Sequence, residues 1–210
     1  MNITDGLIQY LMLISLLTFH EFAHAWTALK CGDDTARLQG RVSLNPVVHI
    51  DPIGTVLLPL MMLLMPGVGQ YLIGWAKPVP FNYHNLNKPQ RDEVLIAMAG
   101  PAMNFLLAIG LIGLARVMDM VHSPDVEQLC VQAAMLSLIL CFFNLIPVPP
   151  LDGSHLLRVA TNMSFEAYTQ FARFGFLIVI VLLQIPAVRT VLYSATLGTM
   201  LLIARIFGVS

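Results

Sequence analysis

Two histidines and a glutamate lie within the first long apolar stretch of the chain, in "LTFHEFAHAW" at residues 17–26. His20 and His24 are four residues apart, which places them about 40° apart on one face of a helix. At that spacing both imidazoles can bind one zinc ion. Glu21 follows the first histidine, where its carboxylate can take a proton from a zinc-activated water. The stretch therefore predicts the metal-binding helix of a hydrolase.

A histidine on an apolar helix is more often a packed side chain than a metal ligand. Here that alternative weakens, because the stretch has the length and composition of a membrane helix. An ionisable side chain at the centre of such a helix costs about 2.5–3.5 kcal/mol on insertion scales. Three of them within five positions need compensation, which metal coordination supplies.

The composition predicts an all-α polytopic membrane protein. Of the 210 residues 57% are hydrophobic and 11% are charged, whereas an ordinary globular domain has about 25% charged residues. The net charge of −1 offers no nucleic-acid-binding surface. We expect a bundle of about five to six membrane segments, with a short amphipathic helix at 154–170 and short extended or β segments near 35–50 and 74–82. The membrane segments are expected near residues 7–29, 53–73, 93–118, 128–146, 171–187 and 190–208.

Basic residues constrain the topology of this bundle. They flank segment 53–73 on both sides, within 30–41 and within 77–91. Positively charged loops favour the cytoplasm, and both loops can lie there only if segment 53–73 enters and leaves the membrane on one side. Proline and glycine interrupt this segment, and such irregular backbone is tolerated in a bilayer when protein shields it. We therefore expect a re-entrant segment and an active site that opens toward the cytoplasm.

A hydrolytic zinc site needs a third protein ligand, and Asp152 in "PVPPLDG" is the best candidate. Prolines break the helix just before it, and Gly153 allows an unusual backbone angle just after it. The spacing alone does not separate a ligand from an aspartate in an ordinary surface turn. The re-entrant topology favours a ligand, because it brings the second half of segment 7–29 and the end of segment 128–146 to the same side.

Five motifs together resemble the site-2 protease family of intramembrane zinc metalloproteases. They are "HEFAH", "GRVSLNPVVHIDPIG", "GWAKPVP", "AGPAMNF" and "PVPPLDGSHLLR". The chain looks most like the compact prokaryotic branch, which lacks PDZ and CBS domains. The similarity covers roughly residues 10–160, and the last third of the chain carries no motif.

The resemblance implies zinc ligands at His20, His24 and Asp152, and Glu21 as general base. His49 and Asn104 also occupy family motif positions. Either could donate a hydrogen bond to the oxyanion that peptide hydrolysis develops, and His49 could instead hold the substrate strand. The alternatives are an interhelical hydrogen bond for Asn104 and a backbone-capping interfacial histidine for His49.

We therefore expect a membrane-embedded protease domain over residues 1–210, with a catalytic core at about 7–160 and C-terminal helices at about 170–208. It would bind one Zn²⁺ and hydrolyse a peptide bond in or near a transmembrane segment of a membrane-protein substrate in the bilayer. "GRVSLN" and "GWAKPVPFN" could bind the unwound substrate by β-augmentation, or could be plain interfacial loops. The alternative functions are a membrane metal-binding or transport protein and a catalytically silent relative. Substrate identity and oligomeric state are open at this level.

Overall fold

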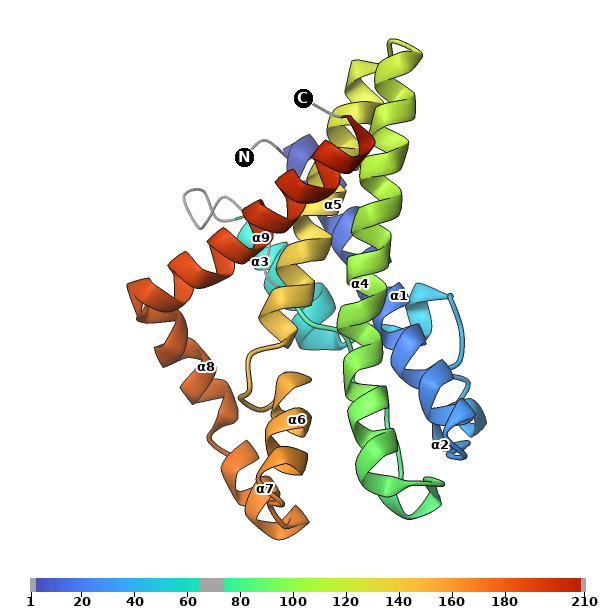
Figure 1. Ribbon diagram of the computed structural model, residues 1–210, viewed down its shortest axis with the longest axis vertical. Helices are drawn as coiled ribbons and strands as arrows, with labels where there is room; N and C mark the ends of the chain where they lie inside the picture. The colour runs from blue at the N-terminus through green and yellow to red at the C-terminus, as the bar shows by residue number, and fades with distance from the viewer. Residues whose placement is uncertain (1–2, 65–73, 209–210) are drawn as a thin grey trace. The chain divides into compact units, whose positions relative to one another are not determined.

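The computed structural model describes residues 3–64 and 74–208, and every regular element in this part of the chain is helical. This confirms the predicted all-α class. Within the described residues, four helices are long and apolar enough to cross a membrane, and a pair of shorter helices bent by 56° makes a fifth span if it counts as one. The four are α1 (Ile3–Lys30), α4 (Pro89–Met120), α5 (Pro124–Asn144) and α9 (Pro186–Phe207), and the bent pair is α7 (Phe165–Ala172) with α8 (Gly175–Gln184) (Figure 1).

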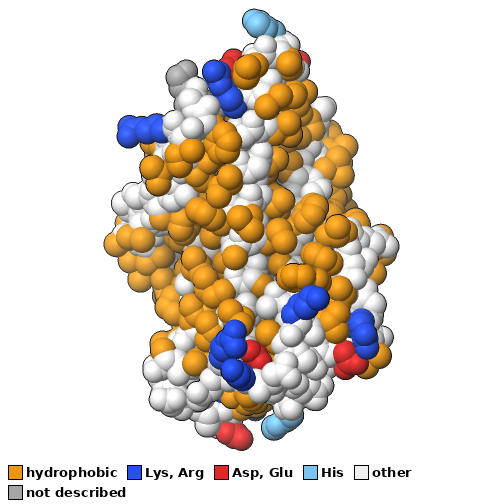
Figure 2. Space-filling view, turned by 45° about the vertical axis from the view of Figure 1, so that its right-hand side comes forward, with side chains coloured by type: hydrophobic (Ala, Val, Ile, Leu, Met, Phe, Trp, Pro, Cys, Tyr) orange, Lys and Arg blue, Asp and Glu red, His pale blue; other side chains and the backbone are white. Residues whose placement is uncertain are grey.

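The surface of the protein has the character of a surface that faces lipid. Hydrophobic side chains make up much of the face drawn in Figure 2, and charged side chains on it are fewer. In α9 only 11% of the apolar window is buried, although exposed apolar patches of this extent are rare on soluble monomers. These observations support a multi-pass membrane protein.

The expected segment at 53–73 is helical in its described part. Residues Pro52–Leu57 form a π-helical turn, η2, and α3 continues from Leu58 to Leu64. At about 1.5 Å per residue these two elements extend for roughly 20 Å, which is less than a hydrocarbon core of ~30 Å. Residues 65–73 lie outside the described part of the chain, so re-entry of this segment stays a prediction.

The structure differs from the expectation of extended structure at 35–50. Residues Thr35–Leu38 form the helical turn α2, and Pro46–His49 form the 3₁₀ turn η1. The side chain of Asn45 caps η1 by accepting a hydrogen bond of 3.1 Å from the N–H of Val47. Local capping of this kind competes with strand pairing, and no strand forms among the described residues.

The chain divides into two compact units, residues 1–92 and 93–210. In the first unit most of the buried residues of α1 lie in its second half, although Phe19 and Trp26 are exposed there, whereas its first half is largely exposed. α1 contacts α2, η1 and α3. The candidate residues His20, Glu21 and His24 thus lie in the half of α1 that protein surrounds.

Asp33 fixes the chain where α1 ends. Its side chain is fully buried and accepts hydrogen bonds from the N–H of Thr35 (3.1 Å), the N–H of Asn82 (2.7 Å) and the side-chain amide of Asn85 (2.9 Å). Burial acts to raise the pKa of Asp33, but a hydrogen bond from the Thr35 hydroxyl together with these three outweighs it and lowers the pKa below its ordinary value. The carboxylate therefore ties the end of α1 to the connection that precedes α4.

In the second unit, α5 packs against α9, as Figure 1 also shows, around a core with small side chains on α4 and α5. The fully buried members of this core are Ala108, Ile112, Ala134 and Leu138, with Ile203 nearly so. The expected amphipathic helix at 154–170 is instead two helices, α6 (Gly153–Ala160) and α7. Ser164 starts α7 by accepting a hydrogen bond of 3.2 Å from the N–H of Ala167.

Candidate metal centre

His20 and His24 face each other on α1, as their spacing predicts. Both side chains are buried, and their Nε2 atoms are 3.0 Å apart. The ring planes are inclined by 80°, with centroids 4.6 Å apart. Two imidazole nitrogens that bind one tetrahedral zinc at 2.0–2.1 Å would be about 3.3 Å apart. The pair therefore fits a shared zinc ion, and nitrogen donors suit that metal.

Glu21 is held by a backbone donor from a distant segment. The side chain is 8% exposed, and its Oε2 accepts a hydrogen bond of 3.1 Å from the N–H of Val79. Pro78 and Pro80 flank Val79 and have no N–H. Val79 is thus the sole backbone donor in that triplet, and it fixes the orientation of the Glu21 carboxylate.

Residues 74–82 have no regular secondary structure, and alternate N–H groups of this segment donate to other parts of the first unit. The N–H of Trp75 donates to the carbonyl of Gly54 (3.2 Å), and the N–H of Lys77 donates to the carbonyl of His49 (2.9 Å). A side chain at Gly54 would collide with the Trp75 ring, because a Cβ there would lie 2.3 Å from it. The segment is therefore clamped against the loop that carries His49, and this places Val79 at Glu21.

Arg41 is a residue near Glu21 that the sequence did not single out. Its side chain is 3% exposed, and Nη2 donates to the carbonyls of Lys77 and Pro78. Burial lowers the pKa of Arg41, while the negative charge of Glu21 opposes that change. Among the described residues, Nε and Nη1 have no hydrogen-bond partner although both are buried. Arg41 therefore offers two donor nitrogens, which carry three N–H groups, to a ligand or water.

His49 is also buried, at 2% exposed, and its ring presents an acceptor. Its Nε2 lies 2.8 Å from the carbonyl of Ser43, and a carbonyl can only accept, so Nε2 carries the proton. Burial lowers the pKa of His49 and outweighs the opposing hydrogen bond to Ser43, which favours the neutral ring. In that tautomer the buried Nδ1, which has no partner among the described residues, accepts hydrogen bonds. This favours holding a substrate N–H over donating to an oxyanion.

Asn104 and Asp152 belong to the second unit, and each is characterised by its own surroundings there. Asn104 is fully buried on α4, and its backbone carbonyl accepts a hydrogen bond of 2.7 Å from the Ser137 hydroxyl of α5. This contact links α4 and α5 through the backbone of Asn104, so it is not the side-chain hydrogen bond that the sequence offered as an alternative. A donor role for the Asn104 side chain stays a prediction.

Asp152 is half-buried and directly precedes α6. The sequence suggested an unusual backbone angle at Gly153, but Gly153 does not have a positive φ. Its role is close approach, because a Cβ there would lie 2.3 Å from the carbonyl oxygen of Leu145. Glycine at this position lets the first turn of α6 pack on the end of α5. This close approach fixes the backbone position from which the Asp152 side chain extends.

The chain matches the model of Peptidase family M50 over residues 8–120 and 110–185. It is 38% identical over 198 residues to "Putative zinc metalloprotease YwhC" of Bacillus subtilis, which covers 90% of this chain and 86% of that protein. "Putative zinc metalloprotease Rip2" of Mycolicibacterium smegmatis is 33% identical over 175 residues, 82% of this chain and 65% of the relative. Rip2 of Mycobacterium tuberculosis H37Rv is 32% identical over 161 residues, which are 74% of this chain and 60% of that protein. The chain thus spans less than two thirds of either Rip2 protein, and no solved structure matches it.

Proposed function

The chain belongs to Peptidase family M50, the site-2 protease family of metalloendopeptidases, and on that premise we propose that it is a zinc-dependent intramembrane endopeptidase. Its substrates would be membrane proteins, cut in or near a transmembrane segment by one membrane-embedded protease domain. The observation that carries this proposal is the facing pair of His20 and His24 on a membrane-length helix, with Glu21 beside them held by a backbone N–H.

The proposed ligands of one zinc ion are His20, His24 and Asp152. Two imidazoles and one carboxylate leave a fourth tetrahedral position open, as hydrolytic zinc sites require. A zinc ion bound there would lower the pKa of a water molecule to about 7 and polarise the peptide carbonyl. The spacing of the histidine nitrogens and the glycine that admits the turn beside Asp152 support this set.

Glu21 is proposed as the general base. Its carboxylate would accept a proton from the attacking water and pass it to the leaving amine. The N–H of Val79 engages one carboxylate oxygen, which restricts rotation of the side chain. Pre-orientation of this kind lowers the entropic cost of the proton transfer.

Arg41 and His49 together suit the backbone of an extended peptide. Nε and Nη1 of Arg41 can donate to a peptide carbonyl, and Nδ1 of His49 can accept from a peptide N–H. The segment at 74–82 is a poorer donor for β-augmentation, because Pro78 and Pro80 have no N–H. We therefore assign substrate carbonyl binding to Arg41, with Asn104 as a second candidate donor.

Arg41→Lys should lower kcat/KM by roughly 10- to 100-fold, since a hydrogen bond to a charged group is worth about 1.5–3 kcal/mol. Lysine keeps the charge but cannot form the guanidinium fork. Arg37→Lys is the matched control, because Arg37 is exposed and forms an ion pair with Asp34 close by in the sequence. Zinc content and thermal stability should be recorded for both variants. Unchanged kcat/KM in Arg41→Lys would exclude Arg41 from substrate binding.

The proposal as a whole is tested by metal removal from the purified protein in proteoliposomes that contain single-span substrates. A membrane-permeant zinc chelator should abolish cleavage, and added zinc should restore it. A protein that binds zinc but cleaves none of a broad substrate panel would favour a metal-binding protein or a silent relative.

The same vesicles test the sidedness of the site. Basic residues at 30–41 and 77–91 favour the cytoplasm for both loops, and both belong to the unit that carries the histidines. We propose a multi-pass protein of the cell membrane whose active site opens toward the cytoplasm. In sealed vesicles of known orientation, a membrane-impermeant chelator should inhibit from the cytoplasmic face alone. Inhibition from the opposite face would reverse the proposed orientation.

A further inference from the structure

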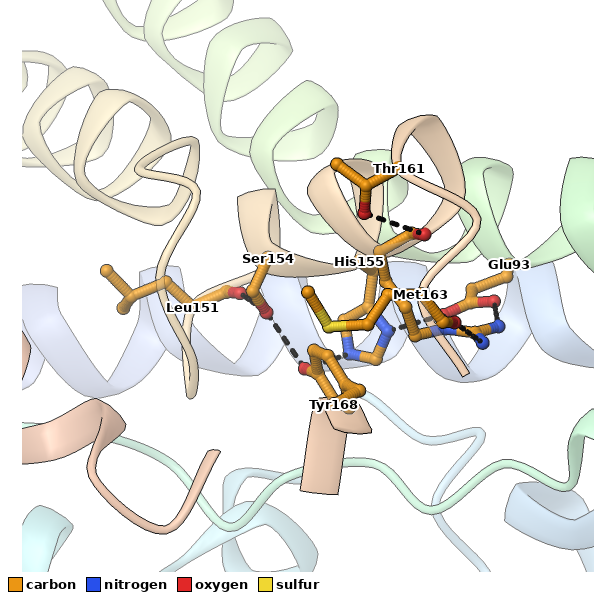
Figure 3. Close-up of polar contacts among 8 residues, drawn as sticks. Glu93, Leu151, Ser154, His155, Thr161, Met163 and Tyr168 are labelled. Atoms are coloured by element: carbon orange, nitrogen blue, oxygen red, sulfur yellow. Dashed lines mark hydrogen bonds and ion pairs between the residues drawn. The ribbon is translucent and has the colours of Figure 1, made fainter. Parts of the chain in front are cut away.

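A buried ion pair joins α4 to α6 within the second unit (Figure 3). Glu93, near the start of α4, is 2% exposed. The guanidinium of Arg158 donates to both of its carboxylate oxygens, with Nε 2.7 Å from Oε1 and Nη2 on Oε2. His155 adds a third contact, its Nδ1 lying 2.8 Å from Oε1. Two residues of α6, three positions apart, therefore share one carboxylate.

The same cluster reaches back to the turn that holds Asp152. The hydroxyl of Ser154 donates to the carbonyl of Leu151 at 2.6 Å, and the Tyr168 hydroxyl of α7 lies 2.8 Å from Ser154 Oγ. Tyr168 also lies 3.3 Å from Nε2 of His155. Figure 3 shows these side chains as one connected group. The residues on both sides of Asp152 are thus fixed, Leu151 by the Ser154 hydroxyl and Gly153 by its contact with α5.

Stability alone does not account for this cluster. A buried ion pair recovers little more than the free energy that its desolvation costs, and an apolar pair of similar size is often as stable. In addition, α6 has eight residues, and a helix this short does not hold its own conformation in isolation. Its rotation about its axis must come from tertiary contacts, and the bidentate Glu93–Arg158 pair fixes that rotation more narrowly than apolar packing would.

We propose that Glu93 and Arg158 are positioning residues that aim the Asp152 carboxylate at the metal. This inference rests on the proposed function, in which Asp152 is a zinc ligand. Successive side chains of a helix lie about 100° apart around its axis, so the direction of each one depends on how the helix is rotated. A small rotation of α6 would therefore move the Asp152 carboxylate out of ligand distance. Neither Glu93 nor Arg158 binds the metal.

The test is the zinc dissociation constant of the purified full-length protein, measured by competition with a chelator of known affinity. Glu93→Gln and Arg158→Met should each weaken zinc binding by roughly 10- to 100-fold, the range typical of groups that support metal ligands. Arg158→Lys should recover only part of the affinity, because lysine cannot bind both carboxylate oxygens. Wild-type affinity in both Glu93→Gln and Arg158→Met would overturn the proposal.

Two controls separate positioning from general loss of stability. Leu138→Ala removes a fully buried side chain of the α4–α5–α9 core, so it should lower the melting temperature without changing zinc affinity. The paired variant Glu93→Met/Arg158→Met removes the charges together, leaves no unpaired buried ion, and should fold yet bind zinc weakly. Equal loss of affinity in Leu138→Ala, or wild-type affinity in the paired variant, would contradict the positioning role.

A double-mutant cycle identifies the route of the effect. In the Asp152→Asn background, Glu93→Gln should weaken zinc binding no further, because both changes disable the same ligand. An undiminished effect of Glu93→Gln in that background would show that Glu93 acts elsewhere, which overturns this inference and leaves the proposed function intact. Unchanged zinc affinity in Asp152→Asn itself would instead overturn the ligand set of the proposed function, and the positioning role with it.

Discussion

Glu21→Gln should lower the rate of proteolysis by about 10²- to 10⁴-fold, the usual contribution of a general base, while zinc remains bound. Glutamine has nearly the same shape, and its amide oxygen can still accept the hydrogen bond from Val79. It cannot take a proton from water. The change therefore removes one chemical step and leaves the position of the side chain intact. Initial rates of substrate cleavage in proteoliposomes and the zinc content of the same preparation are the measurements.

Glu166→Gln is the matched control, because it makes the same chemical change at an exposed position on α7. It should cleave substrate at the wild-type rate. If Glu21→Gln retains more than about a tenth of the wild-type rate with zinc bound, Glu21 is not the base. Loss of zinc together with activity would point to a structural part for Glu21 in holding the histidines.

The long membrane helices were predictable from the sequence because their signal is local. A run of about 20 apolar residues has no other stable place than a lipid bilayer, and α1, α4, α5 and α9 all arise from such runs. The shorter elements depend on contacts between distant residues. The sequence of segment 154–170 is typical of one amphipathic helix. In the structure α6 ends before Ser164, and Ser164 caps a separate helix, α7.

The residues of the candidate site differ in the same way, since some have a local sequence signal and others depend on distant contacts. His20, Glu21 and His24 are readable because five consecutive residues on one helix specify their geometry. The part of Val79 is invisible in the sequence, since it depends on a backbone N–H that lies 58 positions from Glu21. Arg41 had one usable signal, a lone arginine within a motif that the family resemblance already marked. Its burial and its two free donors appear only in the fold.

Glu93 and Arg158 illustrate a second limit. In the sequence, an acidic residue at the start of a membrane helix and a basic residue in an amphipathic helix each look like a solvated charge near a helix end. Their sequence separation of 65 positions gives no hint that they pair. Only the folded chain brings Arg158 of α6 to Glu93 of α4 and buries the pair.

Replacing any one proposed ligand, as in His20→Ala, His24→Ala or Asp152→Ala, should weaken zinc binding beyond the roughly 10- to 100-fold typical of supporting residues. For the histidines, each change removes one of two nitrogens that lie 3.0 Å apart, so one imidazole and the Asp152 carboxylate alone must hold the ion. Asp51 is the informative control among the other acidic residues. Its Oδ1 accepts hydrogen bonds from the N–H groups of Ile53 (3.0 Å) and Gly54 (2.7 Å).

Asp51 caps η2 through one oxygen, and asparagine caps a helix about as well as aspartate, so Asp51→Asn should leave both the local stability and the zinc affinity near their wild-type values. Zinc affinity measured by chelator competition, alongside the melting temperature of the zinc-free protein, separates the two effects. Wild-type zinc binding in Asp152→Ala together with loss of binding in Asp51→Asn would transfer the third ligand to Asp51. The metal would then lie wholly within the first unit, and the "LDG" turn would lose its proposed part in the chemistry.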